Sequence, residues 1–470
     1  MAEPVIELDL SSAWEPPEPP PVLRFRLRSR WVVACAVLAV AAGVLAASGA
    51  KPRTGPLYRV DQPVAGVTVA KDLLVVNRQR QPGGDPTIEG RRRSDGKVLW
   101  SITTDQEQQF AMLGATALIL VRQFNVNRGY TTTLTAVDQA TGRQLWTRPR
   151  TSVLGTHGGL VVAEEMTDPG RVITVATSET PDLTVNQALS RPARHILVLD
   201  ERTGEPVWEL TAPPGVVLDF TWDGRYPAGQ VTGVDQLDPS GLVSSRDIRS
   251  GAVGATHQLD WSGTPAAFHI GAGWYAAPRR GAARAVVHPD GQRGGIVFDL
   301  AGGRALFSTD ASMFAGIYQC AAALFCATSG NGITTYDATT GRPRWHLDRY
   351  TEIAAIVGDR FVVGTFEPEG ATYGQLAVVD ARTGAVTAAL GGWRMIVDAS
   401  AERILLWQPI GPSTAVLGEL DVATGGVTVF GRAGNWYGPP QCGAAGDTLA
   451  CVQLGALSVW RLPARHRGTP

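Results

Sequence analysis

A short turn that ends in glycine recurs eight times along this chain, each time directly after an apolar stretch of strand length. Successive closing glycines are 46, 62, 47, 52, 38, 43 and 41 residues apart. Such a period is typical of one four-stranded β-propeller blade per repeat. The sequence therefore predicts an all-β propeller of about eight four-stranded blades, or of seven or nine if an end unit is shared or a weak central copy is not a blade. The glycines are Gly96, Gly142, Gly204, Gly251, Gly303, Gly341, Gly384 and Gly425.

The aspartate and the glycine of the turn have separate physical roles. The clearest copies read Asp-x-x-Thr-Gly. A carboxylate at the first position accepts hydrogen bonds from backbone N–H groups about two residues further on, and the glycine takes a positive φ without a side-chain clash. We assign these residues to structural turns at the blade peripheries and give them no catalytic role. They are Asp138, Gly142, Asp200, Gly204, Asp337, Gly341, Asp380, Gly384, Asp421 and Gly425.

Aromatic residues follow several of these glycines at a fixed distance. The fourth residue after the glycine is Trp100, Trp146, Trp208 or Trp345 in the best copies. The other copies have Phe307, Val429, Ala255 and Ala388 at this position. We expect each ring to seal its blade against the next and to contribute about 2–3 kcal/mol by apolar burial. The copies around Gly251 and Gly303 match the pattern least well.

Two strings of the repeat carry a resemblance to a known family. They are LTAVDQATGRQLW at residues 134–146 and TYDATTGRPRW at residues 335–345. Both resemble the repeat of pyrroloquinoline-quinone-like (PQQ-like) β-propellers, and the resemblance covers roughly residues 57–463. The family contains dehydrogenases, assembly scaffolds and proteins of unassigned role. The resemblance therefore implies a fold and leaves the function open.

The dehydrogenase branch of that family sets a test for catalysis. Resemblance to that branch would imply a calcium ion beside the quinone, an aspartate acting as base and two adjacent cysteines packed on the cofactor. This sequence has no adjacent cysteines, no C-x-x-C-H haem site and no metal-ligand spacing among its histidines. We therefore predict a protein that is not an enzyme, and we name no catalytic, cofactor-binding or metal residue and no cofactor.

An uncharged apolar stretch near the N-terminus predicts a membrane anchor. It runs from Trp31 to Ala50, and 20 residues of helix, about 30 Å, would cross the hydrocarbon layer. Four arginines between residues 24 and 30 form its heavier positive flank, which favours a cytoplasmic N-terminus and an extracytoplasmic propeller. A cleaved signal peptide is the alternative, because Ser48 and Ala50 are small enough for a processing site.

The expected domain organisation follows from these segments. Residues 1–30 form a disordered cytoplasmic tail, acidic and Pro-rich and then basic, with a short docking strand at residues 5–10 as the alternative. Residues 31–50 form the transmembrane helix and residues 51–56 a linker. Residues 57–463 form the propeller, which we expect to close by pairing an N-terminal strand around residues 57–60 with C-terminal strands. Residues 464–470 are a C-terminal tail.

Four cysteines fall into two similar hairpin contexts. Cys320 precedes Cys326, and Cys442 precedes Cys451, each pair across a short loop. We predict a disulfide within each pair, with about 2–3 kcal/mol of stabilisation, and hence oxidising surroundings. Four buried free thiols are the alternative. Metal binding is disfavoured because neither pair has the C-x2-C spacing or a nearby histidine.

The charge balance and the motifs together limit the classes of function. With 42 basic and 43 acidic side chains, no global field favours nucleic acid. Basic stretches such as Arg91–Arg93 are expected on solvated loop tips, with binding of anionic lipid as the alternative. We predict a bacterial plasma-membrane protein whose propeller binds or organises protein or cell-envelope partners without catalysis. The alternatives are a membrane-bound PQQ-dependent dehydrogenase and a ligand-sensing single-pass membrane protein.

Overall fold

The computed structural model divides the chain into two compact units, Met1–Pro52 and Arg53–Pro470, and all described residues belong to the second unit. The predicted tail, transmembrane helix and most of the linker lie outside the described residues. The described residues are 55–61, 63–70, 72–78, 86–103, 108–113, 116–125, 129–165, 193–222, 230–270, 284–289, 294–309, 317–321, 323–329, 331–367, 372–396, 403–438 and 440–464.

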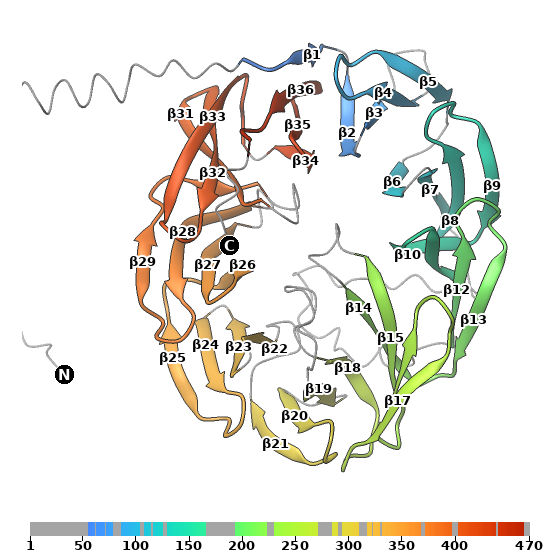
Figure 1. Cartoon of the computed structure of the whole chain (residues 1–470), viewed down its shortest axis with the longest axis vertical. Coiled ribbons are helices and arrows are strands. Elements are labelled where there is room, and N and C mark those ends of the chain that lie inside the picture. The colour runs from blue at the N-terminus through green and yellow to red at the C-terminus, as the bar shows by residue number, and fades with distance from the viewer. Residues whose placement is uncertain are drawn as a thin grey trace, which may run out of the picture. The chain divides into compact units, whose positions relative to one another are not determined.

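These residues form 36 strands and no helix, and four strands to a blade make nine blades arranged in a ring (Figure 1). Within each blade the strands pair antiparallel, and the first strand is innermost.

The strands of each blade follow one another along the chain, except in blade 9. Blades 1 to 3 are β2 (Val64–Val69), β3 (Leu73–Arg78), β4 (Thr87–Arg92) and β5 (Val98–Thr103); β6 (Gln108–Leu113), β7 (Thr116–Asn125), β8 (Gly129–Asp138) and β9 (Gln144–Pro149); and β10 (Thr151–His157), β11 (Leu160–Glu165), β12 (Arg194–Asp200) and β13 (Pro206–Ala212). Blades 4 to 6 are β14 (Val217–Trp222), β15 (Val231–Leu237), β16 (Leu242–Asp247) and β17 (Val253–Gln258); β18 (Pro265–Ile270), β19 (Arg284–Pro289), β20 (Gly295–Asp299) and β21 (Ala305–Thr309); and β22 (Ile317–Ala321), β23 (Leu324–Ser329), β24 (Gly332–Asp337) and β25 (Pro343–Leu347). Blades 7 to 9 are β26 (Glu352–Val357), β27 (Arg360–Glu367), β28 (Thr372–Asp380) and β29 (Val386–Ala389); β30 (Arg394–Met395), β31 (Leu405–Gly411), β32 (Thr414–Asp421) and β33 (Gly426–Gly434); and β34 (Gln441–Ala445), β35 (Thr448–Gln453) and β36 (Ala456–Arg461) with β1 (Tyr58–Val60).

The ring closes in blade 9 by joining the two ends of the propeller. β1 lies at the outer edge of β36, with Tyr58 opposite Val459 and Val60 opposite Leu457. Blade 9 in turn contacts blade 1 through β34, β35 and β2. An N-terminal strand thus completes a C-terminal sheet, as the sequence predicts.

The structure has nine blades where the sequence analysis favoured eight, and the closure explains the difference. Each repeated turn connects the third and fourth strands of one blade, as Gly142 does between β8 and β9. In blade 9 these two strands are β36 and β1, which come from opposite ends of the propeller. No turn can connect them, so the turns number one fewer than the blades.

The core lies between the blades, which accounts for strands that are apolar on both faces. In β3, four consecutive residues from Leu73 to Val76 are at most 4% exposed. Side chains alternate between the two faces of a strand. Leu74 and Val76 therefore pack with residues of blade 9, whereas Leu73 and Val75 pack with residues of blade 2.

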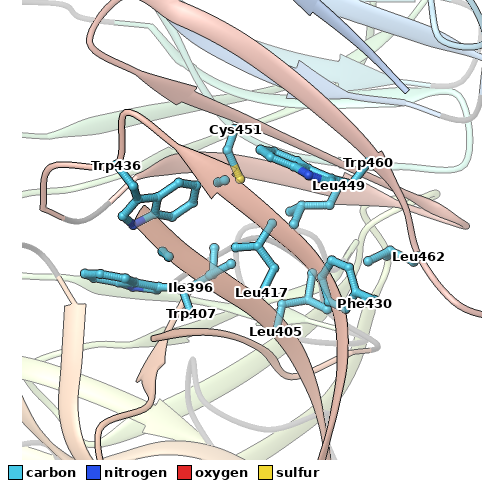
Figure 2. Packing of buried hydrophobic residues seen from close by; sticks show 12 residues of the cluster. Ile396, Leu405, Trp407, Leu417, Phe430, Trp436, Leu449, Cys451, Trp460 and Leu462 are labelled. Carbon is cyan, nitrogen blue, oxygen red and sulfur yellow. The ribbon is translucent and has the colours of Figure 1, made fainter. Parts of the chain in front are cut away.

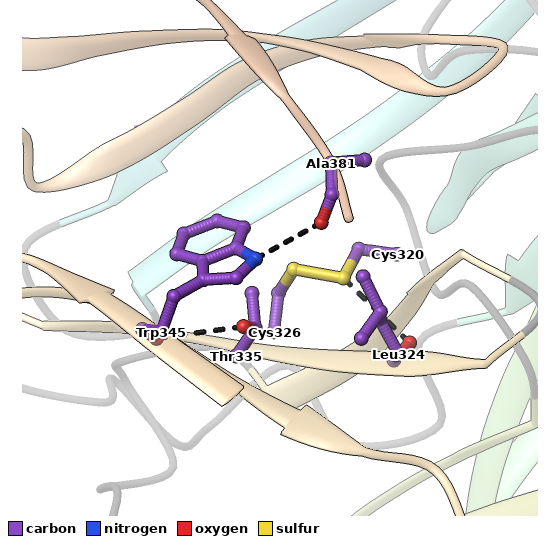
Figure 3. The surroundings of a disulfide bond; sticks show 6 residues. All are labelled: Cys320, Leu324, Cys326, Thr335, Trp345 and Ala381. Atoms are coloured by element: carbon purple, nitrogen blue, oxygen red, sulfur yellow. Dashed lines mark hydrogen bonds between the residues drawn. A yellow bond between two sulfur atoms is a disulfide. The ribbon is translucent and has the colours of Figure 1, made fainter. Parts of the chain in front are cut away.

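The structure pairs the cysteines as predicted. Cys320 of β22 bonds Cys326 of β23, with Cα atoms 5.6 Å apart (Figure 3). Cys442 and Cys451 are directly opposite each other on β34 and β35, with Cα atoms 4.1 Å apart. One disulfide therefore lies in blade 6 and the other in the blade that closes the ring.

Candidate functional site

The predicted turn residues form a self-contained hydrogen-bonded turn. In the second copy, the Gly142 N–H donates to the Asp138 carbonyl over 2.8 Å at a φ of 70°. The Asp138 carboxylate accepts from the Thr141 hydroxyl at 2.7 Å and from the Thr141 N–H at 2.9 Å. These hydrogen bonds hold the pKa of Asp138 below its ordinary value. The turns at Asp200, Asp337 and Asp380 have the same carboxylate contacts, and their pKa values are also lowered.

The predicted tryptophans lie over the turn glycine of the following blade. The Trp146 indole N–H donates to the Glu201 carbonyl at 2.9 Å, and a Cβ on Gly204 would lie only 2.6 Å from the ring. Glycine at this position is therefore required both by its positive φ and by the ring above it. Trp100, Trp208 and Trp345 cover Gly142, Gly251 and Gly384 in the same way, and Figure 3 shows the hydrogen bond from Trp345 to Ala381.

Tyr58 performs this role where the ring closes. Its hydroxyl donates to the Arg93 carbonyl at 3.0 Å, and a Cβ on Gly96 would lie 2.6 Å from its ring. Burial raises the pKa of Tyr58 to about 12, so the phenol stays neutral. Sequence reasoning missed this residue because it precedes the first turn, and the preceding turn that would set its spacing is the one that ring closure removes.

In the first basic stretch Arg92 is exposed at the start of the turn, as predicted, whereas its neighbours have contacts within the protein. Arg91 is in β4 and is 8% exposed, and its guanidinium contacts the Glu89 carboxylate at 2.6 Å. Arg78 contacts the same carboxylate at 2.8 Å. Arg93 reaches the Ala445 carbonyl of blade 9 at 3.1 Å. Arg78 and Arg91 share the Glu89 carboxylate within blade 1, as a buried cation needs a nearby acceptor. Arg93 connects blade 1 to blade 9.

The junction of blades 4 and 5 departs from the sealed arrangement. Ala255 occupies the tryptophan position and is exposed. Gly303 of blade 5 meets backbone instead of a ring: its carbonyl accepts from the Asp260 N–H at 2.6 Å, and a Cβ there would lie 2.0 Å from the Gln258 carbonyl oxygen. The weak match of these copies in the sequence thus corresponds to a different contact.

Two buried carboxylates lie at this same junction. Asp219 of β14 is directly opposite Asp235 of β15, and the two residues are 8% and 5% exposed. Asp219 accepts from the Ile270 N–H of blade 5 at 3.3 Å. Asp235 accepts from the hydroxyls of Thr221 at 3.0 Å and Ser245 at 2.5 Å.

Burial raises the pKa of Asp219 to about 8, and the Asp235 carboxylate adds to this shift. Burial also raises the pKa of Asp235, against the hydrogen bonds from Ser245 and Thr221. Both shifts favour the protonated form of the pair. Within the residues that the structure describes, no group of three or more His, Cys, Asp or Glu side chains is arranged to hold a metal ion.

Blades 8 and 9 present three exposed apolar side chains on adjoining loops. Ile410 is 48% exposed, Tyr437 is 54% exposed and Leu454 is 71% exposed. Ile410 lies near the end of β31, beside the turn between the second and third strands of blade 8. Leu454 belongs to the equivalent turn of blade 9, and Tyr437 belongs to the loop between the blades. Because strands alternate in direction, these connections emerge on the same side of the ring. We call these three residues the loop platform.

Hydrogen bonds join the loops of the platform to one another. The backbone N–H of Trp436 donates to the Ser413 carbonyl at 3.0 Å, and the Gln453 side-chain nitrogen donates to the Gly438 carbonyl at 3.1 Å. Leu454 has a φ of 46°, which is unusual for a branched side chain and is held only where the surrounding structure imposes it. The loops beside the platform are therefore joined by hydrogen bonds.

Three tryptophans lie close together in the core cluster of blades 8 and 9 (Figure 2). Trp436 has its ring centre 5.8 Å from that of Trp407 and 6.5 Å from that of Trp460. The three indole N–H groups are buried and have no hydrogen-bond partner among the described residues. Unpaired buried donors are rare in native interiors. Like the junction of blades 4 and 5, this cluster therefore holds buried polar groups that the repeat does not explain.

The family comparison agrees with the repeat. The family model described as outer membrane protein assembly factor BamB matches residues 48–215 and 193–391. The chain belongs to this family. Membership of the BamB family accounts for the PQQ-like repeat and the propeller. No curated protein matches the sequence.

Several solved structures are similar to this BamB-family chain at low sequence identity. BamB from Moraxella catarrhalis is 15% identical, with a TM-score of 0.38, and the match covers 87% of this chain and 98% of that chain. Sqt1 from Saccharomyces cerevisiae is 11% identical, with a TM-score of 0.41, over 86% and 96%. The quinohemoprotein alcohol dehydrogenase ADHIIG from Pseudomonas putida HK5 is 12% identical, with a TM-score of 0.38, over 88% and 78%. We draw nothing about function from these likenesses.

Proposed function

We propose that this chain is a non-catalytic scaffold of the cell envelope that binds protein partners through the loop platform. The exposure of Ile410, Tyr437 and Leu454 on hydrogen-bonded loops is the observation that carries the proposal. Exposed apolar side chains grouped on a rigid surface mark protein-binding sites, and tyrosine is enriched among the residues that dominate binding energy. Membership of a family described as an assembly factor supports a protein partner.

The proposal includes a membrane anchor and an extracytoplasmic propeller. The described part of the chain contains no helix long and apolar enough to cross a membrane. The anchor rests on the uncharged stretch from Trp31 to Ala50 and on its arginine-rich flank, which favours a cytoplasmic N-terminus. The two disulfides support an oxidising compartment for the propeller.

Proximity labelling in intact cells, with the labelling enzyme fused after the propeller, tests the platform directly. Tyr437→Ser and Leu454→Asn remove the apolar side chains, and asparagine tolerates the positive φ at position 454. We expect both variants to lose the envelope proteins that the unaltered chain labels. Val253→Ser is the matched control, because Val253 is 46% exposed on an outer strand far from the platform in sequence. Recovery of the same proteins by all three variants would contradict the platform as the docking surface.

A separate measurement tests the dehydrogenase alternative. The purified chain is incubated with PQQ and calcium, and reduction of an added dye is followed with alcohols and sugars as substrates. We expect no turnover above that of free PQQ. Quinone retained by the chain together with dye reduction would overturn the non-catalytic function and would leave the membrane anchor unaffected.

A further inference from the structure

We infer that a depression at the junction of blades 4 and 5 binds a neutral saccharide. Its volume is about 620 Å³, within the range of about 300–1,000 Å³ that is common for small-ligand sites. Its aromatic and polar lining comprises Ser240, Gln258, Asp260, Trp261 and Ser262. This inference goes beyond the proposed protein-binding function and concerns different blades.

The absence of the repeat's tryptophan at this junction accounts for the position of the depression. At four other junctions a tryptophan covers the turn glycine of the following blade. Here Ala255 replaces that tryptophan, and the turn of blade 5 is held by the Asp260 N–H instead. Gly302 of that turn consequently forms part of the wall. The chain has a tryptophan, Trp261, in the loop that follows, where it lines the depression instead of sealing the turn.

Backbone hydrogen bonds hold the loop that carries Trp261. The Leu259 N–H donates to the Gly241 carbonyl, and the Gly263 N–H donates to the Pro239 carbonyl, both at 2.9 Å. A Cβ on Gly241 would lie only 2.2 Å from the Trp261 carbonyl oxygen, so the two loops are in close contact. A site that is already ordered avoids part of the entropic cost of binding.

The indole of Trp261 offers a flat apolar surface. The side chain is half-buried and packs against the core cluster of blades 4 and 5 that contains Leu237 and Phe298. It therefore cannot turn away from the depression without losing these contacts. A flat aromatic surface beside polar groups suits a ligand with one apolar face and a polar edge. The C–H face of a pyranose ring, surrounded by hydroxyl groups, has this form.

Gln258 and Asp260 supply hydrogen-bond acceptors to the lining. The Gln258 side-chain nitrogen donates to the carbonyls of Ser240 at 2.8 Å and Leu259 at 3.1 Å, which leaves its oxygen for a ligand. Asp260 is exposed and is the one formally charged residue of the lining. A carboxylate accepts from two neighbouring hydroxyls at once, which matches the vicinal hydroxyls of a sugar.

The same lining disfavours other ligand classes. It contains no lysine or arginine, so phosphate and other anions would face Asp260 without a counter-charge. A purely apolar ligand would leave Gln258 and Asp260 without partners. An organic cation over the indole is the competing ligand, because the Trp261 ring and a carboxylate both attract positive charge.

Saturation-transfer NMR on the full chain in detergent tests the site. The probes are maltotriose, cellotriose and N,N′-diacetylchitobiose as neutral saccharides, and choline as the cation. We expect at least one saccharide to bind in the millimolar range, and we expect choline not to bind. Absence of saccharide binding across this set, or binding of choline alone, would overturn the inference.

Variants then locate the binding. Trp261→Ala and Asp260→Ala should each weaken saccharide binding by about tenfold or more. Asp260→Ala is the decisive variant if Trp261→Ala disturbs packing, because the Asp260 side chain is exposed. Val386→Ser, on an exposed strand of blade 7, is the control and should bind normally. Equal binding by the Asp260 variant and the control would place the saccharide elsewhere. Loss of platform binding leaves this result unchanged, so the two proposals fail separately.

Discussion

The junction between blades 2 and 3 and the junction between blades 4 and 5 hold the same kind of sheets together in different ways. At the first, Trp146 covers Gly204 and donates to the Glu201 carbonyl. At the second, backbone atoms replace the ring, and Asp219 accepts from blade 5 at the inner strands. The comparison teaches that blades pack against each other with or without a tryptophan at the junction. Of these two junctions, the one without a tryptophan carries the buried acids and the solvent-accessible depression.

The largest expected effect concerns the tryptophan itself. Trp146→Ala removes a ring that is 9% exposed and leaves a cavity between blades 2 and 3. We expect a loss of about 3–5 kcal/mol in the free energy of unfolding, as is typical for large-to-small core changes. Urea unfolding followed by circular dichroism measures it. A loss below about 1 kcal/mol would show that the ring is dispensable at a sealed junction as well.

The next effect distinguishes the buried acids from the turn acids by pH. Because the pKa of Asp219 is raised to about 8 in the folded state, the unfolded chain releases this proton first as the pH rises. Stability therefore falls between about pH 4 and 8 through this group. Asp219→Asn should remove that slope and raise the free energy of unfolding at pH 8 by roughly 1–3 kcal/mol relative to the unaltered chain. Asp348→Asn, at an exposed position, is the control, and an unchanged slope in Asp219→Asn would contradict the assignment.

A turn aspartate should respond in the opposite direction. The pKa of Asp200 is lowered by the Thr203 N–H, so its contribution is present at neutral pH and is lost as the pH falls below about 4. Asp200→Ala should cost about 0.5–1 kcal/mol at pH 7, since the carboxylate is exposed and screened. Thermal unfolding at pH 7 and pH 3 measures this, and the difference between variant and unaltered chain should shrink at pH 3. A larger difference at pH 3 would contradict the turn role.

The smallest effect sharpens the contrast at equivalent positions. Ala255 occupies in blade 4 the place that Trp146 occupies in blade 2, yet its side chain is exposed and the turn of blade 5 rests on Gln258 instead. Ala255→Ser should change the free energy of unfolding by less than about 0.5 kcal/mol. The urea series used for Trp146 provides the measurement. A substantial loss would mean that position 255 seals a junction after all.

Local chemistry made much of the architecture predictable from sequence. The turn at Asp138 and Gly142 repeats because its hydrogen bonds and its positive φ need those residues. A motif of five residues therefore predicts a whole hairpin. The ninth blade escaped this reasoning because β36 and β1 meet without a turn. Tyr58 escaped it for the same reason.

The candidate sites depend on contacts that spacing does not encode. Asp219 and Asp235 become opposite only through the register of one hairpin, in strands whose sequence shows no special acid pattern. Ile410, Tyr437 and Leu454 come from the end of a strand, a loop between blades and a turn, respectively. Leu454 lies exposed in a turn, in a backbone conformation that leucine rarely adopts, and no propensity predicts it.

Closure by β1 makes the first strand of the propeller to be synthesised wait for the last. Only three residues, from Tyr58 to Val60, fasten the beginning of the propeller to the sheet built by its end. Until β36 is made, blade 1 lacks blade 9 as its neighbour, and apolar residues such as Leu74 and Val76 remain exposed to water. Assembly is therefore expected to be cooperative over the whole ring. A nascent chain that stops before residue 456 cannot circularise, and this fold should tolerate truncation at its C-terminus far worse than an open array of repeats would.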